Sequence, residues 1–226
     1  MSLFINHLLF FITLISLNIF FLFFYEKLAS KVNLYDLPDQ IRKFHKNKTP
    51  LLGGLIIYTN ITLIMFFNFF LDDILTYKFN LNNNLEIIIF FISSSALFAV
   101  GFLDDKYDLK ISIRLFLYSL IIFFTLFFDN SLIVKDLNFS FLRDEIYLGN
   151  LAIPITLLCF IMLINALNMF DGINLQLVIY IINILFFLLV YSSYHLYIIG
   201  IITPLVLILY LNYKSKIFLG DNGSVL

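Results

Sequence analysis

The chain has 226 residues, of which 62% are hydrophobic and 13% are charged, with a net charge of −1 and a mean hydropathy of +0.99. A soluble domain of this size cannot hide so much apolar surface, because most of its residues still contact water. The composition therefore excludes an ordinary soluble protein and indicates an integral membrane protein. A single cysteine, Cys159, excludes an internal disulfide framework and a cysteine-based zinc site.

Seven apolar runs predict membrane-spanning helices, since about 20 apolar residues cross a bilayer as a helix. They cover residues 3–24, 51–71, 87–103, 113–131, 152–170, 175–191 and 196–212. The first run lacks the basic start and the small-residue cleavage site of a signal peptide, so we expect it to be retained as a span. The last two share one uncharged stretch, and we place the turn between them at residues 191–195. The predicted fold is an all-α, polytopic membrane helix bundle, with residues 1–226 as a single transmembrane domain.

The distribution of lysine and arginine predicts which ends of these helices face the cytoplasm, because cytoplasmic loops carry an excess of basic residues. With the loops alternating between the two sides, one side receives most of the 14 basic residues. The few on the other side are Lys78, Lys135 and Arg143. This pattern predicts an N-terminus outside the cell and cytoplasmic loops near residues 25–50, 104–112, 171–174 and 213–226. The alternating stretch 133–137 of the long outer loop suggests a small hairpin.

Four aspartates lie at the predicted cytoplasmic ends of three helices: Asp104 and Asp105, Asp171, and Asp221. Two carboxylates at about 4 Å repel by roughly 4 kcal/mol at an effective dielectric near 20. An isolated pair of this kind is more often a solvated helix end than a site. The presence of Asp171 and Asp221 on the same side favours a shared polar cleft, and such oxygen ligands suit Mg²⁺ or Mn²⁺ beside phosphate.

Basic residues occur close to these aspartates. Lys106, Lys110 and Arg114 are four apart, which predicts one face of a helix. Each of them is individually explained by snorkelling at the lipid headgroups. The first loop carries a further basic group, made up of Arg42, Lys43, His45, Lys46 and Lys48. Carboxylates with a metal ion, surrounded by cations, are typical of phosphate chemistry.

Two smaller motifs complete the set. Gly53 and Gly54 indicate either close approach of backbone or ligand, or tight helix packing, and the sequence does not favour one over the other. Asn165, Asn168 and Asp171 are spaced by three, which places them on one helix face near the membrane surface. Polar groups at membrane depth are costly, so we favour a functional role for this set.

Taken in order along residues 33–226, the motifs resemble those of the polyprenyl-phosphate N-acetylhexosamine-1-phosphate transferases, which include the MurNAc-pentapeptide translocase. The matching pieces are Asp36-x-Pro38, Arg42-Lys43-x-His45, Thr49-Pro50-x-x-Gly53-Gly54, Gly101-Phe102-Leu103-Asp104-Asp105 followed by Arg114, Asn165-x-x-Asn168-x-x-Asp171-Gly172, and Phe218-Leu219-Gly220-Asp221-Asn222-Gly223-Ser224. The Arg-Lys-x-His form favours the GlcNAc-1-phosphate branch of the family.

The resemblance implies an enzyme of the plasma (inner) membrane with a cytoplasmic active site. Polyprenyl phosphate, such as undecaprenyl phosphate, attacks the β-phosphorus of a UDP-N-acetyl amino sugar, and UMP leaves. The product serves the synthesis of cell-envelope polysaccharides such as O-antigen. Related enzymes are often homodimers, and no nucleic-acid partner is expected.

The resemblance also assigns roles to residues. Asp221 resembles the Mg²⁺ ligand, and Asp104 and Asp105 resemble the carboxylates that handle the lipid phosphate. Asp171 and the substrate-binding residues, which are Arg42, Lys43, His45, Lys48, Gly53, Gly54, Arg114, Asn165, Asn168, Asn174 and Phe218, resemble the groups around the sugar nucleotide and the metal. Of these, Phe218 resembles a position that stacks on uracil, and Lys48 one that contacts the diphosphate.

Two departures from the family pattern affect these expectations. The third motif reads Asp171-Gly172-Ile173-Asn174, with Asn174 where the family commonly has a second aspartate. The chain also stops at Leu226, whereas the family continues with several more helices and a histidine-rich loop. The resemblance therefore implies a C-terminally incomplete chain that lacks part of the active site.

Two other classes of function, a transporter and a non-catalytic scaffold, are alternatives to the enzyme. A transporter would place its acidic residues deep in the bilayer on broken helices, whereas these aspartates gather at helix ends on one side. A non-catalytic membrane scaffold would need no such cluster. An assay for UMP release would distinguish the three classes. An enzyme would release UMP, a carrier would transport a solute without releasing UMP, and a scaffold would do neither. Transfer from UDP-MurNAc-pentapeptide or another UDP-amino sugar is the alternative within the enzyme class.

Overall fold

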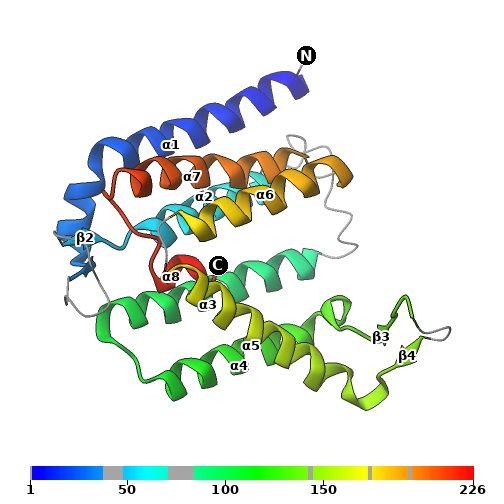
Figure 1. Ribbon diagram of the computed structural model, residues 1–226. Coiled ribbons are helices and arrows are strands. Elements are labelled where there is room, and N and C mark those ends of the chain that lie inside the picture. The colour runs from blue at the N-terminus through cyan, green and yellow to red at the C-terminus, as the bar shows by residue number, and fades with distance from the viewer. Residues whose placement is uncertain (1, 38–47, 71–83, 142–144, 173–174, 193–194) are drawn as a thin grey trace.

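The computed structural model describes residues 2–37, 48–70, 84–141, 145–172, 175–192 and 195–226. Within these residues lie eight α-helices (Figure 1), with the bounds α1 Ser2–Val32, α2 Gly53–Phe70, α3 Asn84–Tyr107, α4 Ile111–Phe128, α5 Ala152–Phe170, α6 Gln176–Tyr191, α7 His195–Tyr213 and α8 Asp221–Ser224. Two short antiparallel hairpins join them: β1 Tyr35–Asp36 with β2 Thr49–Pro50, and β3 Asp136–Leu137 with β4 Ile146–Tyr147. Single 3-10 turns, Asn130–Leu132 and Gly149–Leu151, flank the second hairpin.

The helices form two groups with α8 between them (Figure 1). In the first group α7 packs against α1, α2 and α6, and in the second α4 packs against α3 and α5. The short helix α8 contacts α3, α2 and α5, so the C-terminal segment lies inside the bundle. Elements far apart in the sequence therefore meet at this one short helix.

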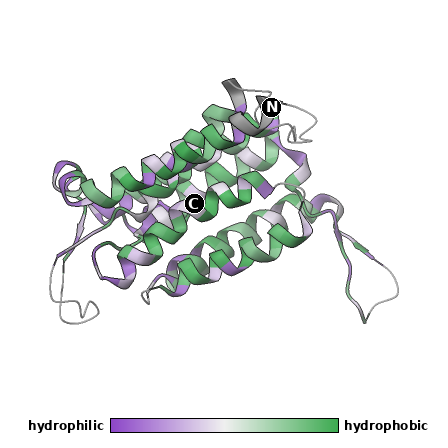
Figure 2. Ribbon diagram, turned by 90° about the horizontal axis from the view of Figure 1, so that it is seen from above, coloured by the Kyte–Doolittle hydropathy of each residue, from purple (hydrophilic) through white to green (hydrophobic). Residues whose placement is uncertain are grey.

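The outside of the bundle is apolar, as expected for a protein that contacts lipid. Five helical segments are long and apolar enough to cross a membrane: His7–Val32, Leu85–Tyr107, Ile111–Phe128, Gly149–Phe170 and His195–Tyr213. Two shorter apolar helices, Gly53–Asn68 and Gln176–Tyr191, accompany them. Figure 2 shows hydrophobic residues along the length of these helices and hydrophilic ones mainly near their ends. The chain is an all-α, multi-pass membrane helix bundle, which confirms the predicted fold class.

The helix boundaries differ from the predicted ones at two places that matter for the site. Helix α3 continues past residue 103 to Tyr107, so Asp104 and Asp105 lie within its last turn. Helix α2 begins at Gly53 rather than at residue 51, because Thr49–Pro50 pairs with Tyr35–Asp36 as a strand. The predicted hairpin in the loop after α4 is present as β3–β4, and α6 and α7 separate at the predicted turn.

Three glycines create the space in which the C-terminal segment lies. A Cβ atom added to Gly54 would stand 2.1 Å from Asn222 Oδ1 and 2.4 Å from the Asn222 carbonyl carbon. At Gly101 it would stand 2.6 Å from Asn222 Cα, and at Gly53 2.6 Å from Leu219 Cα. Side chains cannot approach backbone this closely, so α2 and α3 need glycine at these positions. Gly53 and Gly54 therefore allow close approach of backbone and tight packing at the same contact. The partner in that contact is the backbone of residues 219–223.

A pair of buried asparagines links α1 to α2 within the membrane-spanning region. Asn18 Nδ2 donates to Asn60 Oδ1 at 3.0 Å, and Asn60 Nδ2 donates to Asn18 Oδ1 at 3.3 Å. Each amide also donates to a carbonyl one turn earlier in its own helix, Leu14 O or Ile56 O. Because lipid offers no hydrogen-bonding groups, this reciprocal pair favours one register between the two helices.

We expect Gly54→Ala to displace α8 and to lower the midpoint of thermal unfolding in detergent by several degrees, since its methyl group would overlap Asn222. Gly200→Ala is the matched control: its added Cβ would meet Ile64 Cδ1 at 3.2 Å and Phe10 Cζ at 3.3 Å, which are the ends of side chains. An equal loss in the two variants would contradict the proposed packing of the C-terminal backbone.

We expect Asn60→Leu to destabilise the fold by about 1–2 kcal/mol, because the Asn18 amide loses its partner in α2. The double variant Asn18→Leu/Asn60→Leu should recover part of this loss, since neither unpaired amide remains. Unfolding in mixed detergent micelles measures both variants. Strictly additive losses would show that the two amides do not act as a pair.

Candidate active site

The centre of the site is an arginine that contacts two carboxylates. Arg114 Nη1 lies 2.5 Å from Asp104 Oδ2 and 2.8 Å from Asp221 Oδ2. The other oxygen of Asp104 accepts a hydrogen bond from the Leu109 N–H at 2.9 Å. Asp104 is buried, while Arg114 and Asp221 keep part of their surface exposed. One guanidinium therefore joins α3, α4 and the start of α8.

The turn between α3 and α4 brings Arg114 back to Asp104. Asp108 has a φ of 52°, so the chain reverses after Tyr107 and α4 begins at Ile111. The expected single helix face with Lys106, Lys110 and Arg114 is therefore wrong. Lys106 belongs to α3, Lys110 precedes α4, and both are exposed, whereas Arg114 turns inward.

Asp105 faces the C-terminal segment. Its two oxygens accept hydrogen bonds from the backbone N–H groups of Asp221 and Asn222, both at 2.9 Å. The preceding Gly220 has a φ of 78°, and an added Cβ there would stand 2.9 Å from Asp105 Oδ2. Only glycine suits this conformation and this space. Adjacent residues in α3 thus act differently: Asp104 meets the Asp221 side chain, both directly and through Arg114, and Asp105 binds the Asp221 backbone.

Asp171 approaches the same segment from α5. It follows the last helical residue, Phe170, and accepts a hydrogen bond from the Gly220 N–H. Asn165 and Asn168 lie on the last two turns of α5 as predicted, both half-buried, and Asn165 Nδ2 donates to Ile161 O at 2.9 Å. The predicted group of three polar residues is therefore present at the end of this helix.

Asp171 and Asp221, which lie outside the membrane-spanning helices, both have raised pKa values because burial disfavours their charged forms and nearby cations do not balance the negative charge of the site. Burial, together with the charge of Asp105, raises the pKa of Asp171 to about 7 despite the Gly220 N–H. Burial, a hydrogen bond with Asp104 and the charges of Asp105 and Asp104 raise the pKa of Asp221 to about 8, although Arg114 opposes the shift. These raised values indicate a site that attracts further positive charge.

The structure brings four predicted carboxylates, Asp104, Asp105, Asp171 and Asp221, to one place around the start of α8. Among the described residues, no three His, Cys, Asp or Glu side chains lie close enough together to hold a metal ion by themselves. The donor set nevertheless suits Mg²⁺, because Asp104 and Asp221 are near enough to share one cation, Arg114. Mg²⁺ commonly uses one or two carboxylates and takes its other ligands from water and substrate phosphates.

The β1–β2 hairpin is hydrogen-bonded to the segment that precedes α8. Lys48 Nζ lies 4.7 Å from the ring centroid of Tyr35, across the β1–β2 hairpin. The backbone of Phe218 donates to Pro50 O at 2.8 Å and accepts from the Gly53 N–H at 3.1 Å. The hairpin, the start of α2 and the segment before α8 are thus hydrogen-bonded together. The predicted residues Arg42, Lys43, His45 and Asn174 lie outside the described residues.

Two asparagines were missed as site residues by the sequence analysis. Asn222, fully buried, accepts from the Gly54 N–H at 3.1 Å through Oδ1. Asn212 Oδ1 accepts from the Leu175 N–H at 3.0 Å, and its Nδ2 donates to Ile217 O at 3.2 Å. Asn212 could have been recognised as a polar residue in an apolar run. Asn222 was quoted as part of a motif, but nothing in the sequence indicated its partner 168 residues away.

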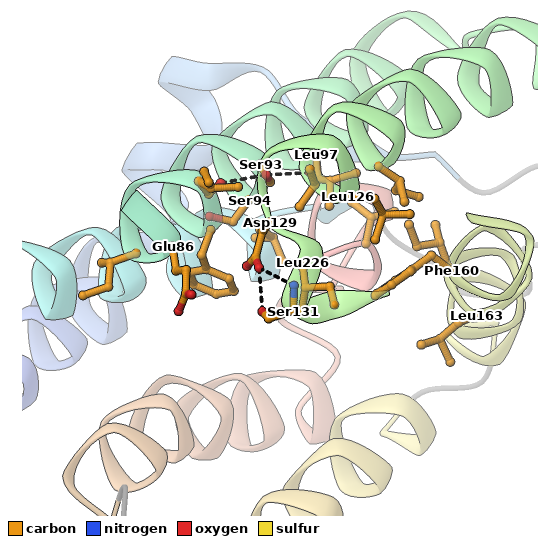
Figure 3. A pocket seen from close by; sticks show the side chains of 18 of the residues that line it. Glu86, Ser93, Ser94, Leu97, Leu126, Asp129, Ser131, Phe160, Leu163 and Leu226 are labelled. Atoms are coloured by element: carbon orange, nitrogen blue, oxygen red, sulfur yellow. Dashed lines mark hydrogen bonds between the residues drawn. The ribbon is translucent and has the colours of Figure 1, made fainter. Parts of the chain in front are cut away.

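An apolar cavity of about 480 Å³ adjoins the site (Figure 3). Leu97 of α3, Leu126 of α4 and Phe160 and Leu163 of α5 line it. Val225 and Leu226, directly after α8, also line it, as do Glu86 and Asp129 at the ends of α3 and α4 that lie away from the aspartates. The cavity therefore lies among the membrane-spanning helices and is bordered by the residues that follow α8.

Comparison with known proteins gives a consistent family. Residues 87–226 match the model of glycosyl transferase family 4. An undecaprenyl-phosphate α-N-acetylglucosaminyl 1-phosphate transferase of Escherichia coli O157:H7 is 33% identical over 164 residues, which cover 71% of this chain and 41% of the relative. The proteins of the same name from Escherichia coli K12 and Yersinia pestis are 32% identical over 71% of the chain and 30% identical over 68%.

The chain spans 41% of the length of the Escherichia coli relatives and 38% of that from Yersinia pestis. The matched region includes all four aspartates and Arg114, which lie within residues 87–226. The chain therefore belongs to glycosyl transferase family 4.

Proposed function

We propose that the protein transfers a phospho-N-acetyl amino sugar, GlcNAc-1-phosphate in the first place, from a UDP-sugar to a polyprenyl phosphate. An oxygen of the lipid phosphate attacks the β-phosphorus of the UDP-sugar, the bond from that phosphorus to the UMP oxygen breaks, and UMP leaves. The observation that carries this proposal is the group of four aspartates that α3, α5 and α8 bring together around Arg114. The names of the relatives supply undecaprenyl phosphate and N-acetylglucosaminyl 1-phosphate.

Asp221 and Asp104 would bind Mg²⁺ in the proposed reaction. When bound, the ion would neutralise charge on the diphosphate of the donor as the phosphorus is attacked. Arg114, which already contacts both carboxylates, would hold them near each other and screen the charge that remains. Because a phosphate monoester has lost most of its second proton at pH 7, with a pKa of about 6, the lipid substrate needs no strong base.

The hydrogen bonds of Asp105 suggest a narrower role than the family resemblance does. Both of its oxygens are used by the N–H groups of Asp221 and Asn222. We therefore assign Asp105 to positioning Asp221, and Asp104 to the charged centre. Asp171, Asn165 and Asn168 would contact the sugar nucleotide from α5.

The β1–β2 hairpin and the cavity suggest where the two substrates lie. Lys48, on the hairpin, would contact the diphosphate, and Phe218 would stack on uracil. The isoprenoid chain of the lipid would occupy the apolar cavity between α3, α4 and α5, with its phosphate near the start of α8. In this proposal the protein lies in the plasma membrane, with the aspartates facing the cytoplasm and the N-terminus outside. The product serves the synthesis of envelope polysaccharides.

The proposal is tested by incubating the purified protein with UDP-GlcNAc, Mg²⁺ and undecaprenyl phosphate, and by measuring UMP and the lipid product. We expect Asp221→Asn to lower kcat/KM at least about 100-fold, because the amide binds Mg²⁺ poorly. Asp108→Asn is the matched control: Asp108 is exposed in the nearby turn, its φ is 52°, and asparagine accepts that conformation well.

Other outcomes separate the competing functions. UMP release that persists after chelation, or that is unchanged in Asp221→Asn, would contradict the assigned role of Asp221. Transport of a solute without UMP release would indicate a carrier, and neither activity a scaffold. Preference for UDP-MurNAc-pentapeptide would keep the reaction but change the donor.

The pKa of Asp171 predicts how stability depends on pH in the presence of a chelator. The folded protein holds a proton up to about pH 7 that the unfolded chain loses near pH 4. The corresponding stability is fully present below about pH 4 and is lost as the pH rises through 7. We expect Asp171→Asn, which cannot ionise, to make this decline shallower by up to about 1.4 kcal/mol per pH unit. Thermal unfolding between pH 4 and 8 measures the slope, with Asp108→Asn as control, and an unchanged slope in Asp171→Asn would refute the assignment.

A further inference from the structure

The β3–β4 hairpin is fixed at the end of the bundle that lies opposite the aspartates. It leaves α4 after Phe128 and returns to α5 at Ala152. Two bonds hold its base: the Leu148 N–H donates to Lys135 O at 2.9 Å, and the Val134 N–H donates to the hydroxyl of Thr156, in the second turn of α5, at 3.0 Å. Since both neighbouring helices are long enough to cross a membrane, this base lies at the boundary of the bilayer.

The hairpin exposes aromatic side chains. Phe141 is 79% exposed and Tyr147 is 76% exposed, and the rings of Phe139 and Phe141 lie 5.2 Å apart. Figures 1 and 2 both show the hairpin standing clear of the helix bundle. The described helices therefore do not cover these aromatic rings. Exposed aromatic rings of this kind indicate a contact with lipid or with another protein.

The helix ends that carry the hairpin also expose apolar side chains. Phe127 and Phe128 at the end of α4 and Leu151 at the start of α5 are more than half exposed. They close two membrane-spanning segments, whose exposed side chains meet acyl chains. The hairpin also carries polar groups, including an Asn138–Glu145 hydrogen bond of 3.2 Å. Aromatic and polar groups together are typical of segments at the membrane–water interface.

We propose that the described arms of the β3–β4 hairpin, residues 134–141 and 145–148, lie in the interfacial layer of the bilayer, with Phe139 and Phe141 inserted among the lipids. The partner is the lipid surface itself, and the contact does not depend on the proposed transferase activity. It would fix the end of α4 and the start of α5 relative to the bilayer, and both helices line the apolar cavity.

The chain contains no tryptophan, which permits a direct test. In Phe141→Trp the only tryptophan emission comes from the hairpin. Reconstituted in phosphatidylcholine vesicles, this variant should emit at shorter wavelength than Glu145→Trp. Phosphatidylcholine brominated in the upper acyl chain should quench it at least about twofold more strongly than the control. Asn138→Trp provides a second control on the polar part of the hairpin should Glu145→Trp fail to fold.

Two results would overturn the proposal. Emission of Phe141→Trp that resembles a tryptophan in water, with ready quenching by acrylamide and none by brominated lipid, would place the hairpin in solution. Protection from both acrylamide and brominated lipid would show that protein, such as a second copy of the chain, covers the aromatic rings.

Discussion

The arrangement of the site depends on one shared cation. Arg114 holds a carboxylate of α3 and a carboxylate of α8 within hydrogen-bonding distance of the same nitrogen. Without it, no basic side chain would lie between the Asp104 and Asp221 carboxylates. Their electrostatic repulsion would then destabilise the fold, and partial burial makes this repulsion stronger. In the proposed function, the same excess of negative charge would attract a divalent cation, and the cation in turn would bind the phosphate groups.

A second constraint is steric. Gly54 and Gly101 let the backbone around Asn222 approach α2 and α3, and Asp105 binds the N–H groups at the start of α8. The position of Asp221 is therefore determined by backbone contacts and not by a long flexible side chain. Groups that must meet a metal ion and a phosphate benefit from such fixed placement.

Most of the fold followed from the sequence, because spans in a membrane are set by hydrophobic length. The aspartates and the Asn165–Asn168–Asp171 set were also predictable, since polar residues at helix ends stand out in an apolar chain. The inward turn of Arg114 was not: it depends on Asp108 adopting a left-handed conformation, which breaks the apparent helical spacing. The strand at Thr49–Pro50 and the partner of Asn222 were also missed, because each depends on a contact between segments distant in sequence.

The central place of α8 has a consequence for how the protein is made. Its contacts with α2 and α3 join residues more than 100 positions apart, as in the pairs Asp105–Asp221 and Gly54–Asn222. During synthesis α2 and α3 emerge first, so the gap lined by Gly54 and Gly101 has to stay open until the later segment arrives. The four aspartates would then come together only after residues 219–222 have emerged, and a ribosome that stalls before residue 219 would leave the gap between α2 and α3 unfilled.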